Sequence, residues 1–384
     1  MTVPADPRSS EQGAPAALAD PWRAQRMSTQ QQAMPAGRVV VSCPAPYGAG
    51  GLGRHLQEIA EALARRGDPA EIISESSGLR DGGAPRPALG LVELAGAVRR
   101  LARLSPAWRM WAVSAGFDAA AARRLGPADH LIAFNGTALA QFGGARKAGA
   151  EGLWLMSANP HMRRVIGQHE RAYRRHPVER PWSTHLLRRN LAEYERADGI
   201  YVSSRYVWES FAQEGFAEDR LRFFPLTPDP RFQPSREPRR SNTFDVLYSG
   251  SLVVHKGVPL LIDAFRRLAP KDLRLVLLGG WKTAQMRRYI ERACAEDQRI
   301  SAGPGDPLRN LHDASLCVHP AYEDGFAYAP AEALACGVPV IVSEDTGMKE
   351  LIGSDRHGLV LPTGDADKLA QAIDAAYRGE ILGG

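Results

Sequence analysis

Short apolar runs alternate with helix-length amphipathic segments along most of this chain, and this alternation restricts the fold more than any other feature. In the first half, five segments read as buried strands: residues 39–41, 71–74, 130–134, 152–157 and 199–203. Helical patterns separate them, and the first of these, 53–66, carries its apolar residues on one face. Strands joined through helices pair in parallel, with helices on both faces of the sheet. The pattern therefore predicts an α/β fold.

The second half of the chain repeats the pattern after a proline-rich stretch, 223–238, that has no apolar periodicity. Its predicted strands are 244–249, 273–278, 316–319 and 338–342, with helices over about 260–268 and 284–295. We therefore predict two Rossmann-like doubly wound domains facing across a cleft, where folds of this class bind ligands. The predicted divisions are a disordered leader (1–37), an N-terminal domain (38–225), a C-terminal domain (226–365) and a C-terminal helix (366–384).

Composition indicates a soluble cytoplasmic protein, with 44% hydrophobic and 24% charged residues. No apolar run approaches the roughly 18 residues of a membrane-spanning helix, and the N-terminus lacks an apolar secretory core. The four cysteines are scattered and the histidines form no H-E-x-x-H pattern. We expect neither disulfides nor a bound metal.

The densest chemical signal is the segment 319–340, in which two acids, Asp324 and Glu332, flank Gly325-Phe326-Ala327. A helix is predicted to begin near Pro330. The amide groups of 325–327 would then gather at its start, a seat for phosphate or sugar oxygens. Glu332, expected in the first turn, can accept hydrogen bonds from ribose hydroxyls, and Asp324 can accept them from the transferred sugar.

A second loop, 248–257, follows a predicted strand and carries Gly250, His255 and Lys256. An ammonium group at this position suits a diphosphate, because it stabilises the negative charge that develops as a glycosidic bond breaks. A surface lysine without function is the alternative.

These two loops, with Ala335-Cys336-Gly337-Val338-Pro339-Val340, resemble family 4 (group 1) glycosyltransferases, retaining enzymes of the GT-B fold. The resemblance implies a hexosyl transfer from a UDP- or GDP-sugar without a metal or other cofactor. The product would be a polysaccharide, glycolipid or other glycoconjugate. It further implies that 226–365 binds the donor, 38–225 binds the acceptor, and 366–384 is a shortened crossover helix.

Two positions depart from the family pattern. The first acid is Asp324 where the family more often has glutamate, with Glu323 beside it as a substitute, and the loop has Ser251 and His255 where an arginine is common. These departures leave a second hypothesis open: a catalytically weakened nucleotide-sugar-binding or partner subunit.

The N-terminal half contributes a glycine loop, 48–53, and a histidine. The loop fits G-x-G-x-x-G, but Pro44-Ala45-Pro46-Tyr47 intervenes between the preceding strand and the loop, whereas a dinucleotide-binding loop follows its strand almost directly. By resemblance, Gly50 and Gly51 would approach the donor phosphate or the acceptor; an oxidoreductase loop and a plain structural turn are the alternatives. His161 is a candidate catalytic residue by resemblance, against a structural, hydrogen-bonded histidine.

The net charge of +5 is concentrated in the N-terminal half. Eight arginines cluster there: Arg163, Arg164, Arg171, Arg174, Arg175, Arg180, Arg188 and Arg189. Such a face suits an anionic or lipid-linked acceptor, or peripheral contact with the inner face of the membrane; a solvated surface is the alternative. No nucleic-acid-binding module accompanies the charge, so nucleic acid is not expected.

Overall fold

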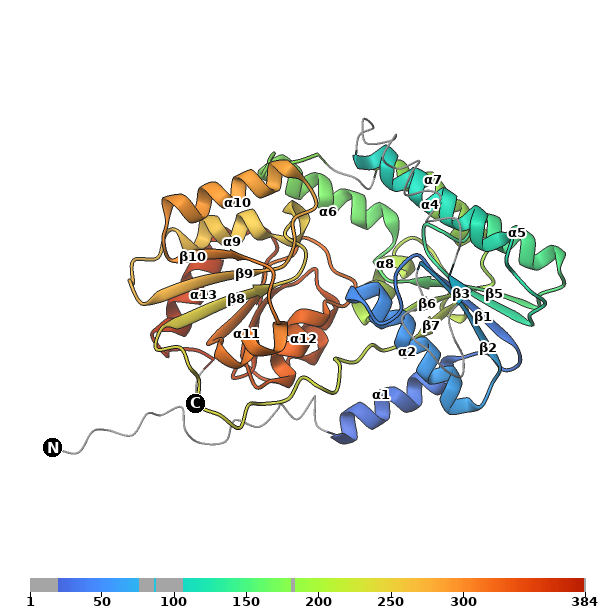
Figure 1. The fold of residues 1–384 in the computed structure, drawn as a ribbon, viewed down its shortest axis with the longest axis horizontal. Coiled ribbons are helices and arrows are strands. Elements are labelled where there is room, and N and C mark those ends of the chain that lie inside the picture. The colour runs from blue at the N-terminus through green and yellow to red at the C-terminus, as the bar shows by residue number, and fades with distance from the viewer. Residues whose placement is uncertain (1–19, 76–85, 88–105, 181–183, 383–384) are drawn as a thin grey trace. The chain divides into compact units, whose positions relative to one another are not determined.

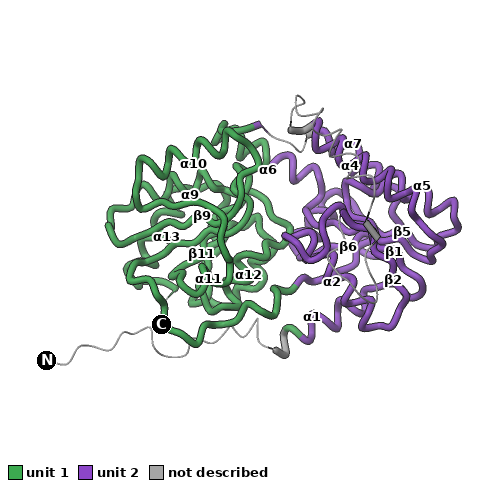
Figure 2. Tube along the Cα trace, in the orientation of Figure 1, with its two compact units in different colours: residues 1–23, 168–179, 227–384 green, residues 24–167, 180–226 purple. Residues whose placement is uncertain are grey.

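The computed structural model describes residues 20–75, 86–87, 106–180 and 184–382 (Figure 1). The chain divides into two compact units (Figure 2). The C-terminal unit comprises Met1–Arg23, Gln168–Glu179 and Thr227–Gly384; the N-terminal unit comprises Ala24–Gly167 and Arg180–Leu226.

The N-terminal unit is built on a parallel sheet with the strand order β3-β2-β1-β4-β5-β6-β7. Its strands are β1 Val39–Cys43, β2 Ala70–Ser74, β3 Arg86–Pro87, β4 His130–Phe134, β5 Gly152–Ser157, β6 Gly199–Val202 and β7 Leu221–Phe223. Its helices are α1 Asp20–Ala33 from Ala24 onward, α2 Gly50–Arg66, α4 Pro106–Ala122, α5 Leu139–Lys147, α6 Met162–Arg175 as far as Gly167, α7 Leu187–Arg196 and α8 Arg205–Ala212, with short 3-10 turns η3 Thr184–Leu186 and η4 Glu218–Arg220.

The C-terminal unit has a second parallel sheet, ordered β10-β9-β8-β11-β12-β13. Its strands are β8 Phe244–Ser249, β9 Leu273–Leu278, β10 Ile300–Gly303, β11 Leu316–His319, β12 Val340–Ser343 and β13 Gly358–Leu361. The helices are α9 Val258–Phe265, α10 Ala284–Glu296, α11 Pro307–Asp313, α12 Tyr328–Ala335 and α13 Ala366–Tyr377, with 3-10 turns η5 Val254–Lys256 and η6 Gly347–Leu351.

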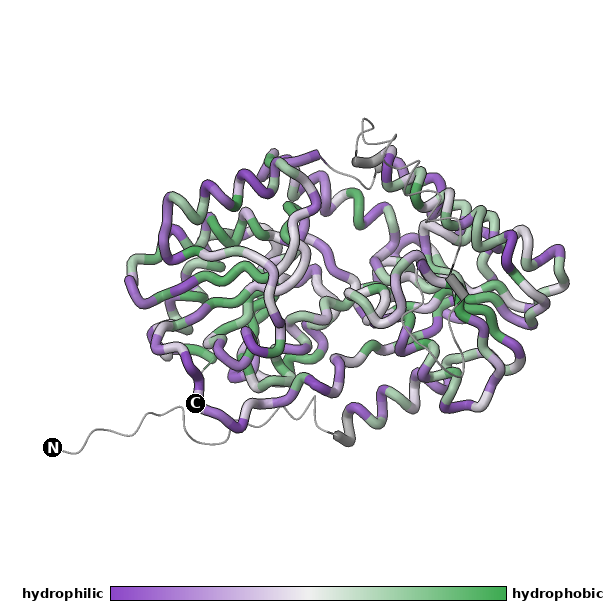
Figure 3. The backbone as a smooth tube through the Cα atoms, in the orientation of Figure 1, coloured by the Kyte–Doolittle hydropathy of each residue, from purple (hydrophilic) through white to green (hydrophobic). Residues whose placement is uncertain are grey.

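Apolar strands form the core of each unit. All five residues of β1 are buried, as are all four of β11. Figure 3 shows β8 and β9 as largely hydrophobic, whereas α10 alternates between hydrophilic and hydrophobic positions. Continuous burial of this kind is expected where helices cover both faces of a parallel sheet. The α/β fold with two doubly wound domains predicted from the sequence is confirmed; the cleft between the domains stays a prediction.

The strand order locates the site in the C-terminal unit. Strand β8 pairs with β9 on one side and with β11 on the other, so the connections that leave β8 and β11 run in opposite directions. Ligands of doubly wound folds bind beyond the carboxyl ends of the strands at such a reversal. The loops that follow β8 and β11 are 250–257 and 320–327, the two segments that carry the predicted chemistry.

The structure differs from the predicted disordered leader at residues 20–33, which form α1. The side chain of Gln30 is buried and donates hydrogen bonds to Glu58 and to the carbonyl of Pro225. Tyr201 donates to the carbonyl of Ala33. The local composition of residues 20–33 did not predict this helix, because residues distant in the sequence hold it in place. The remainder of the leader, 1–19, lies outside the described residues.

Two further boundaries differ from expectation. Residues 168–179, which the sequence assigns to the N-terminal domain, belong to the C-terminal unit; they comprise the last two turns of α6 and the turn after it. Within 366–384, helix α13 packs against α9, and its Leu369 and Ile373 belong to the same apolar core as β8. The cut between units falls at Leu226/Thr227, inside the proline-rich stretch.

Gly279→Ala should strongly destabilise the protein. A Cβ at Gly279 would lie 1.8 Å from the carbonyl oxygen of Gly250, and the residue has φ +150°. We expect the free energy of unfolding in urea to fall by about 1–3 kcal/mol. Gly280→Ala is the matched control, because a Cβ there meets no atom within 4 Å. Equal stability of the two variants would contradict this close approach.

Candidate functional site

The loops after β8 and β11 touch each other through their backbones. Gly257 has φ +77°, and a Cβ there would lie 2.0 Å from the carbonyl oxygen of Pro320. The amide of Tyr322 donates to the carbonyl of His255 at 2.8 Å. Only glycine permits this combination of a left-handed conformation and a close backbone approach. The two predicted binding loops therefore form one structural element.

Lys256 and Asp324 meet where the loops join. The ammonium of Lys256 lies 2.9 Å from Asp324 Oδ2 and donates to the carbonyl of Glu323 at 2.8 Å. The two side chains are 17% and 20% exposed, so both charges are largely withdrawn from water yet accessible. The structure thus brings together a cation and an acid that lie 68 positions apart in the sequence, between 256 and 324.

The same carboxylate oxygen of Asp324 that meets Lys256 also contacts His319, a residue that the sequence interpretation missed. His319 Nε2 lies 3.1 Å from Asp324 Oδ2, and its ring stacks on Tyr248 with an interplanar angle of 5°. Its position at the end of the predicted strand 316–319, five residues before Asp324, was the available signal.

The electrostatics favour the charged forms of both partners. Burial opposes ionisation of Asp324, but Lys256 and His319 lower its pKa far below the ordinary value. Burial likewise opposes the charge on Lys256, but Asp324 and Glu323 raise the pKa of the ammonium above its usual range. A fixed cation beside a fixed carboxylate can hold an anionic group and a hydroxyl at adjacent positions.

Gly325, Phe326 and Ala327 connect this pair to α12. Ala327 is left-handed, with φ +66° and ψ +86°, and immediately precedes the helix. The carbonyl of Phe326 accepts from the amide of Met348 at 2.8 Å, so the segment after β12 fixes the turn. A left-handed alanine costs about 1–2 kcal/mol, and these surrounding bonds compensate for it.

Helix α12 begins at Tyr328 rather than near Pro330, which moves Glu332 from the predicted first turn to the second. Glu332 is half-buried beside two buried thiols, Cys317 and Cys336. Burial, and then the charge of Glu332, raises the pKa of each thiol to about 12. The predicted ribose contact of Glu332 stays a prediction.

His255 stands where an arginine is common in the family, but its surroundings do not favour a positive charge. Its side chain is 5% exposed, its ring stacks on His169 at 4.1 Å, and Tyr173 Oη lies 3.3 Å from its Nδ1. Burial, together with His169 and Lys256, lowers the pKa of His255 well below its ordinary value. The imidazole is neutral and packs against residues 168–179.

His161 lies in the N-terminal unit in a buried aromatic cluster. The ring is 1% exposed and contacts Tyr194 and Phe211 at centroid distances of 4.8 and 5.2 Å. Its own amide donates to Ser210 Oγ at 2.8 Å. These contacts match the structural histidine that the sequence left as the alternative.

Gly50 and Gly51 begin α2 and are exposed. Gly50 has φ +62°, but a Cβ there meets nothing within 4 Å. The constrained position is Gly53, where a Cβ would lie 2.0 Å from the carbonyl oxygen of Pro46. The loop therefore folds onto itself, and the helix starts three residues earlier than the predicted residue 53.

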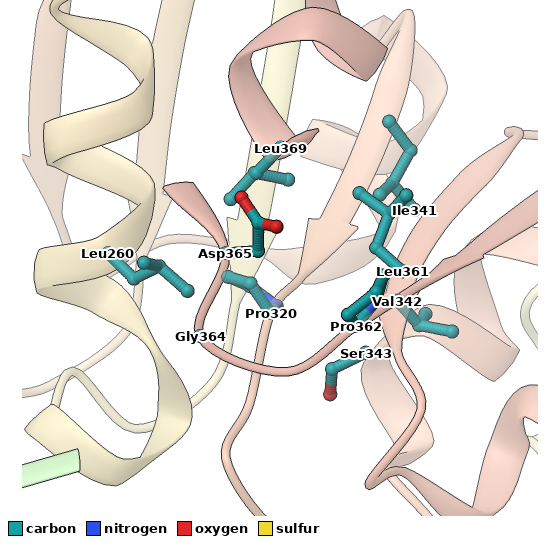
Figure 4. A pocket seen from close by; sticks show the side chains of 10 residues that line it. All are labelled: Leu260, Pro320, Ile341, Val342, Ser343, Leu361, Pro362, Gly364, Asp365 and Leu369. Atoms are coloured by element: carbon teal, nitrogen blue, oxygen red, sulfur yellow. The ribbon is translucent and has the colours of Figure 1, made fainter. Parts of the chain in front are cut away.

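A small cavity adjoins the same edge of the C-terminal sheet (Figure 4). It is lined mainly by apolar side chains, with Pro320 and Ser343 on its wall, and its volume is about 10 Å³. That volume matches one water molecule and is far below that of a nucleotide.

None of the described helices combines the length and apolar character needed to cross a membrane. Within the same residues, no three His, Cys, Asp or Glu side chains gather as metal ligands. The absence of a metal from the reaction stays a prediction.

The fold and the joined loops define the class: a protein of two doubly wound α/β units with a candidate ligand site at the carboxyl edge of the C-terminal sheet. Residues 230–382 match the family described as "Glycosyl transferases group 1". The family resemblance recognised from the sequence is thereby confirmed over these residues.

Curated relatives match over shorter stretches. The O-antigen chain mannosyltransferase B of Escherichia coli is 31% identical over 33% of this chain and 35% of its own length. The D-inositol 3-phosphate glycosyltransferase of Pseudarthrobacter chlorophenolicus is 28% identical over 50% of each chain. This chain therefore spans about a third to a half of such relatives.

Solved structures match over nearly the whole chain. Sucrose-phosphate synthase from Thermosynechococcus elongatus has a TM-score of 0.65 at 18% identity, covering 88% of this chain and 89% of its own. HepE of Anabaena, solved in complex with UDP-glucose, has a TM-score of 0.62 at 16% identity, covering 89% and 90%. At these identities the likeness shows the fold.

The buried state of His161 predicts a pH dependence of stability. Burial lowers the pKa of His161 from 6.5 to about 4. Because the unfolded chain takes up the proton first, the stability contributed by the neutral ring is fully present above pH 6.5 and is lost as the pH falls toward 4. Between pH 6.5 and 4, the free energy of unfolding of the wild type should therefore fall by about 1–3 kcal/mol because of His161. This part of the fall should be absent from His161→Phe in urea unfolding curves recorded across the same pH range. Parallel curves for wild type and variant would contradict the assignment.

Proposed function

We propose that the chain is a retaining glycosyltransferase that transfers a hexosyl group from a UDP- or GDP-sugar to an acceptor in glycan synthesis. The observation that carries the proposal is the Lys256–Asp324 pair at the strand-order reversal of the C-terminal unit. The group 1 family match over the same residues supports it. Two similar proteins also support it: one is named as a mannosyltransferase, and the other was solved in complex with UDP-glucose.

In this proposal Lys256 faces the diphosphate of the donor. As the bond between the sugar and the β-phosphate breaks, negative charge grows on the leaving group, and a preorganised ammonium stabilises it more than water would. The polypeptide segment at 325–327, which leads into α12, provides amide groups for the same oxygens. Because Lys256 supplies the positive charge, we propose that no metal or other cofactor takes part.

Asp324 orients the transferred sugar in this proposal. Lys256 and His319 keep its carboxylate ionised, so it can accept hydrogen bonds from sugar hydroxyls. Glu332, in the second turn of α12, accepts from the ribose hydroxyls. His161 is not included, because its ring is enclosed by aromatic side chains.

A nucleotide-sugar-binding subunit with weak catalysis is the second candidate. The neutral state of His255 favours this candidate. Lys256 is then the one side chain of the loop 250–257 that offers a positive charge to the diphosphate, whereas the family often adds an arginine. Donor binding by calorimetry without transfer or hydrolysis would identify this case.

The proposal is tested by activity with UDP-glucose, UDP-galactose and GDP-mannose, with the anomer of the product read by proton NMR. We expect retention of the donor's anomeric configuration. Lys256→Ala should lower kcat by about 10²–10³-fold, the size of effect seen when one transition-state contact is removed.

Lys271→Ala is the control. Lys271 is exposed and precedes β9, at the opposite edge of the sheet from the site, so its loss should leave kcat within about twofold. Inversion of configuration, or equal activity of the Lys256 and Lys271 variants, would contradict the proposal.

We propose further that the acceptor is anionic or lipid-linked and that the protein works at the inner face of the membrane. The supporting surface lies on α4 of the N-terminal unit, where Trp108, Met110 and Trp111 are 49%, 39% and 39% exposed. His185 packs on Trp108 at 4.5 Å, and Arg188 is exposed on α7. Tryptophan beside cationic residues is typical of surfaces that contact anionic lipid head groups.

Co-sedimentation with vesicles tests this surface. Wild type should bind vesicles of phosphatidylglycerol mixed with phosphatidylcholine and release them at high salt, and the double variant Trp108→Ala/Trp111→Ala should bind at least about tenfold more weakly. Val360→Ala, which removes an apolar side chain of similar exposure in the C-terminal unit, should bind as wild type. Equal binding of all three proteins would contradict the proposal.

A further inference from the structure

Residues 168–179 lie directly behind the candidate donor site. They come from the first half of the sequence but belong to the C-terminal unit, where three of their side chains reach the loops 250–257 and 320–327. The three are His169, Tyr173 and Glu179, which are 1%, 7% and 8% exposed. These residues are buried, polar and unused by the proposed chemistry.

His169 contacts both loops at once. Its Nε2 lies 3.4 Å from Glu323 Oε2, and the Glu323 side chain is 1% exposed. The same imidazole stacks on His255 at a centroid distance of 4.1 Å and an interplanar angle of 28°. Isolated charges are costly in such an environment, so a buried glutamate depends on the partners that surround it.

Glu323 connects His169 to the reactive pair. Its carbonyl accepts the hydrogen bond from Lys256 Nζ at 2.8 Å, and Asp324 is the next residue in the chain. Burial opposes ionisation of Glu323, yet Lys256 and His169 lower its pKa below the ordinary value. A shift of Glu323 would therefore move two groups: its own carbonyl, which accepts the hydrogen bond from Lys256, and the carboxylate of the adjacent Asp324.

Two further contacts hold the other loop. Glu179 accepts from the amide of Val254 at 3.0 Å and from Thr283 Oγ1. Tyr173 Oη lies 3.3 Å from His255 Nδ1. Because η5 spans Val254–Lys256, these contacts fix the turn that presents the lysine.

We propose that His169 is a positioning residue for the Lys256–Asp324 pair and acts through the carboxylate of Glu323. The inference rests on the proposed function, since it assigns His169 a part in the same donor site. The groups that face His169 are Glu323 on the loop after β11 and His255 on η5, with Tyr173 on its own helix. Direct contact with the donor is not part of the proposal, because His169 is buried behind the loops.

The same segment offers a matched control. His176 is also buried and also pairs with an acid, its Nδ1 lying 3.6 Å from Asp263 Oδ2, but Asp263 belongs to α9 and not to either loop. His176→Phe therefore removes a comparable histidine–carboxylate contact from residues 168–179 without touching Glu323.

The test compares His169→Phe, His169→Gln and His176→Phe in the full chain. Phenylalanine keeps a ring against His255 but loses the contact with Glu323, and glutamine restores a donor near the position of Nε2. We expect His169→Phe to lower kcat about tenfold or more with UDP-glucose or GDP-mannose, whichever the wild type uses, because small displacements of catalytic groups are costly. His169→Gln should recover most of this loss, and His176→Phe should stay within about twofold of wild type.

Hydrogen–deuterium exchange of the unliganded proteins gives a second readout. The amides of 320–327 should exchange faster in His169→Phe than in either wild type or His176→Phe, because the loop has lost its anchor. Equal kcat losses or equal exchange in the two phenylalanine variants would overturn the proposal. A wild type that transfers no sugar would contradict the proposed function, and the exchange measurement would still decide whether His169 positions the loop.

Discussion

The ion pair between Lys256 and Asp324 is the interaction on which the candidate site depends. It joins a loop after β8 to a loop after β11, and both charges lie largely out of water. Two such charges are stable only when each has several partners, and here His319, the carbonyl of Glu323 and the loop backbones provide them. The pair is thus both a product of the fold and the group best placed to meet a charged ligand.

The sheet topology explains why these residues meet. Reversal of the strand order at β8 and β11 places the two loops side by side at the carboxyl edge of the sheet. Gly257 and Gly279 then allow backbone approaches that any side chain would block. The charges are thus preorganised: folding supplies the free energy that holds them in place, so no reorganisation is needed during catalysis.

Much of this could be predicted from local patterns. Apolar runs located β4, β5, β8, β9 and β11 with their observed bounds, because buried parallel strands are apolar along their whole length. The spacing of Lys256, Asp324 and Glu332 in a family-like motif identified the loops that meet. The start of α12 was misplaced by two residues, because a left-handed alanine at position 327 gives no sequence signal.

The errors arise where distant contacts decide the outcome. The sequence shows that His255 stands where an arginine is common, but not that its ring is neutral, because this follows from burial against His169 and Tyr173, about 80 positions earlier in the chain. Helix α1 depends on bonds from Gln30 to Glu58 and Pro225. The participation of 168–179 in the C-terminal unit likewise has no local signature. Single-sequence patterns report periodicity and motif spacing, not which helix covers which loop.

The most direct test of the central claim is a crystal structure of the protein with bound UDP-glucose or GDP-mannose. The account predicts that the diphosphate oxygens lie within hydrogen-bond distance of Lys256 Nζ and next to the 325–327 segment, with a sugar hydroxyl on Asp324. A nucleotide sugar bound with its phosphates remote from Lys256, and with the Lys256–Asp324 pair undisturbed, would contradict it.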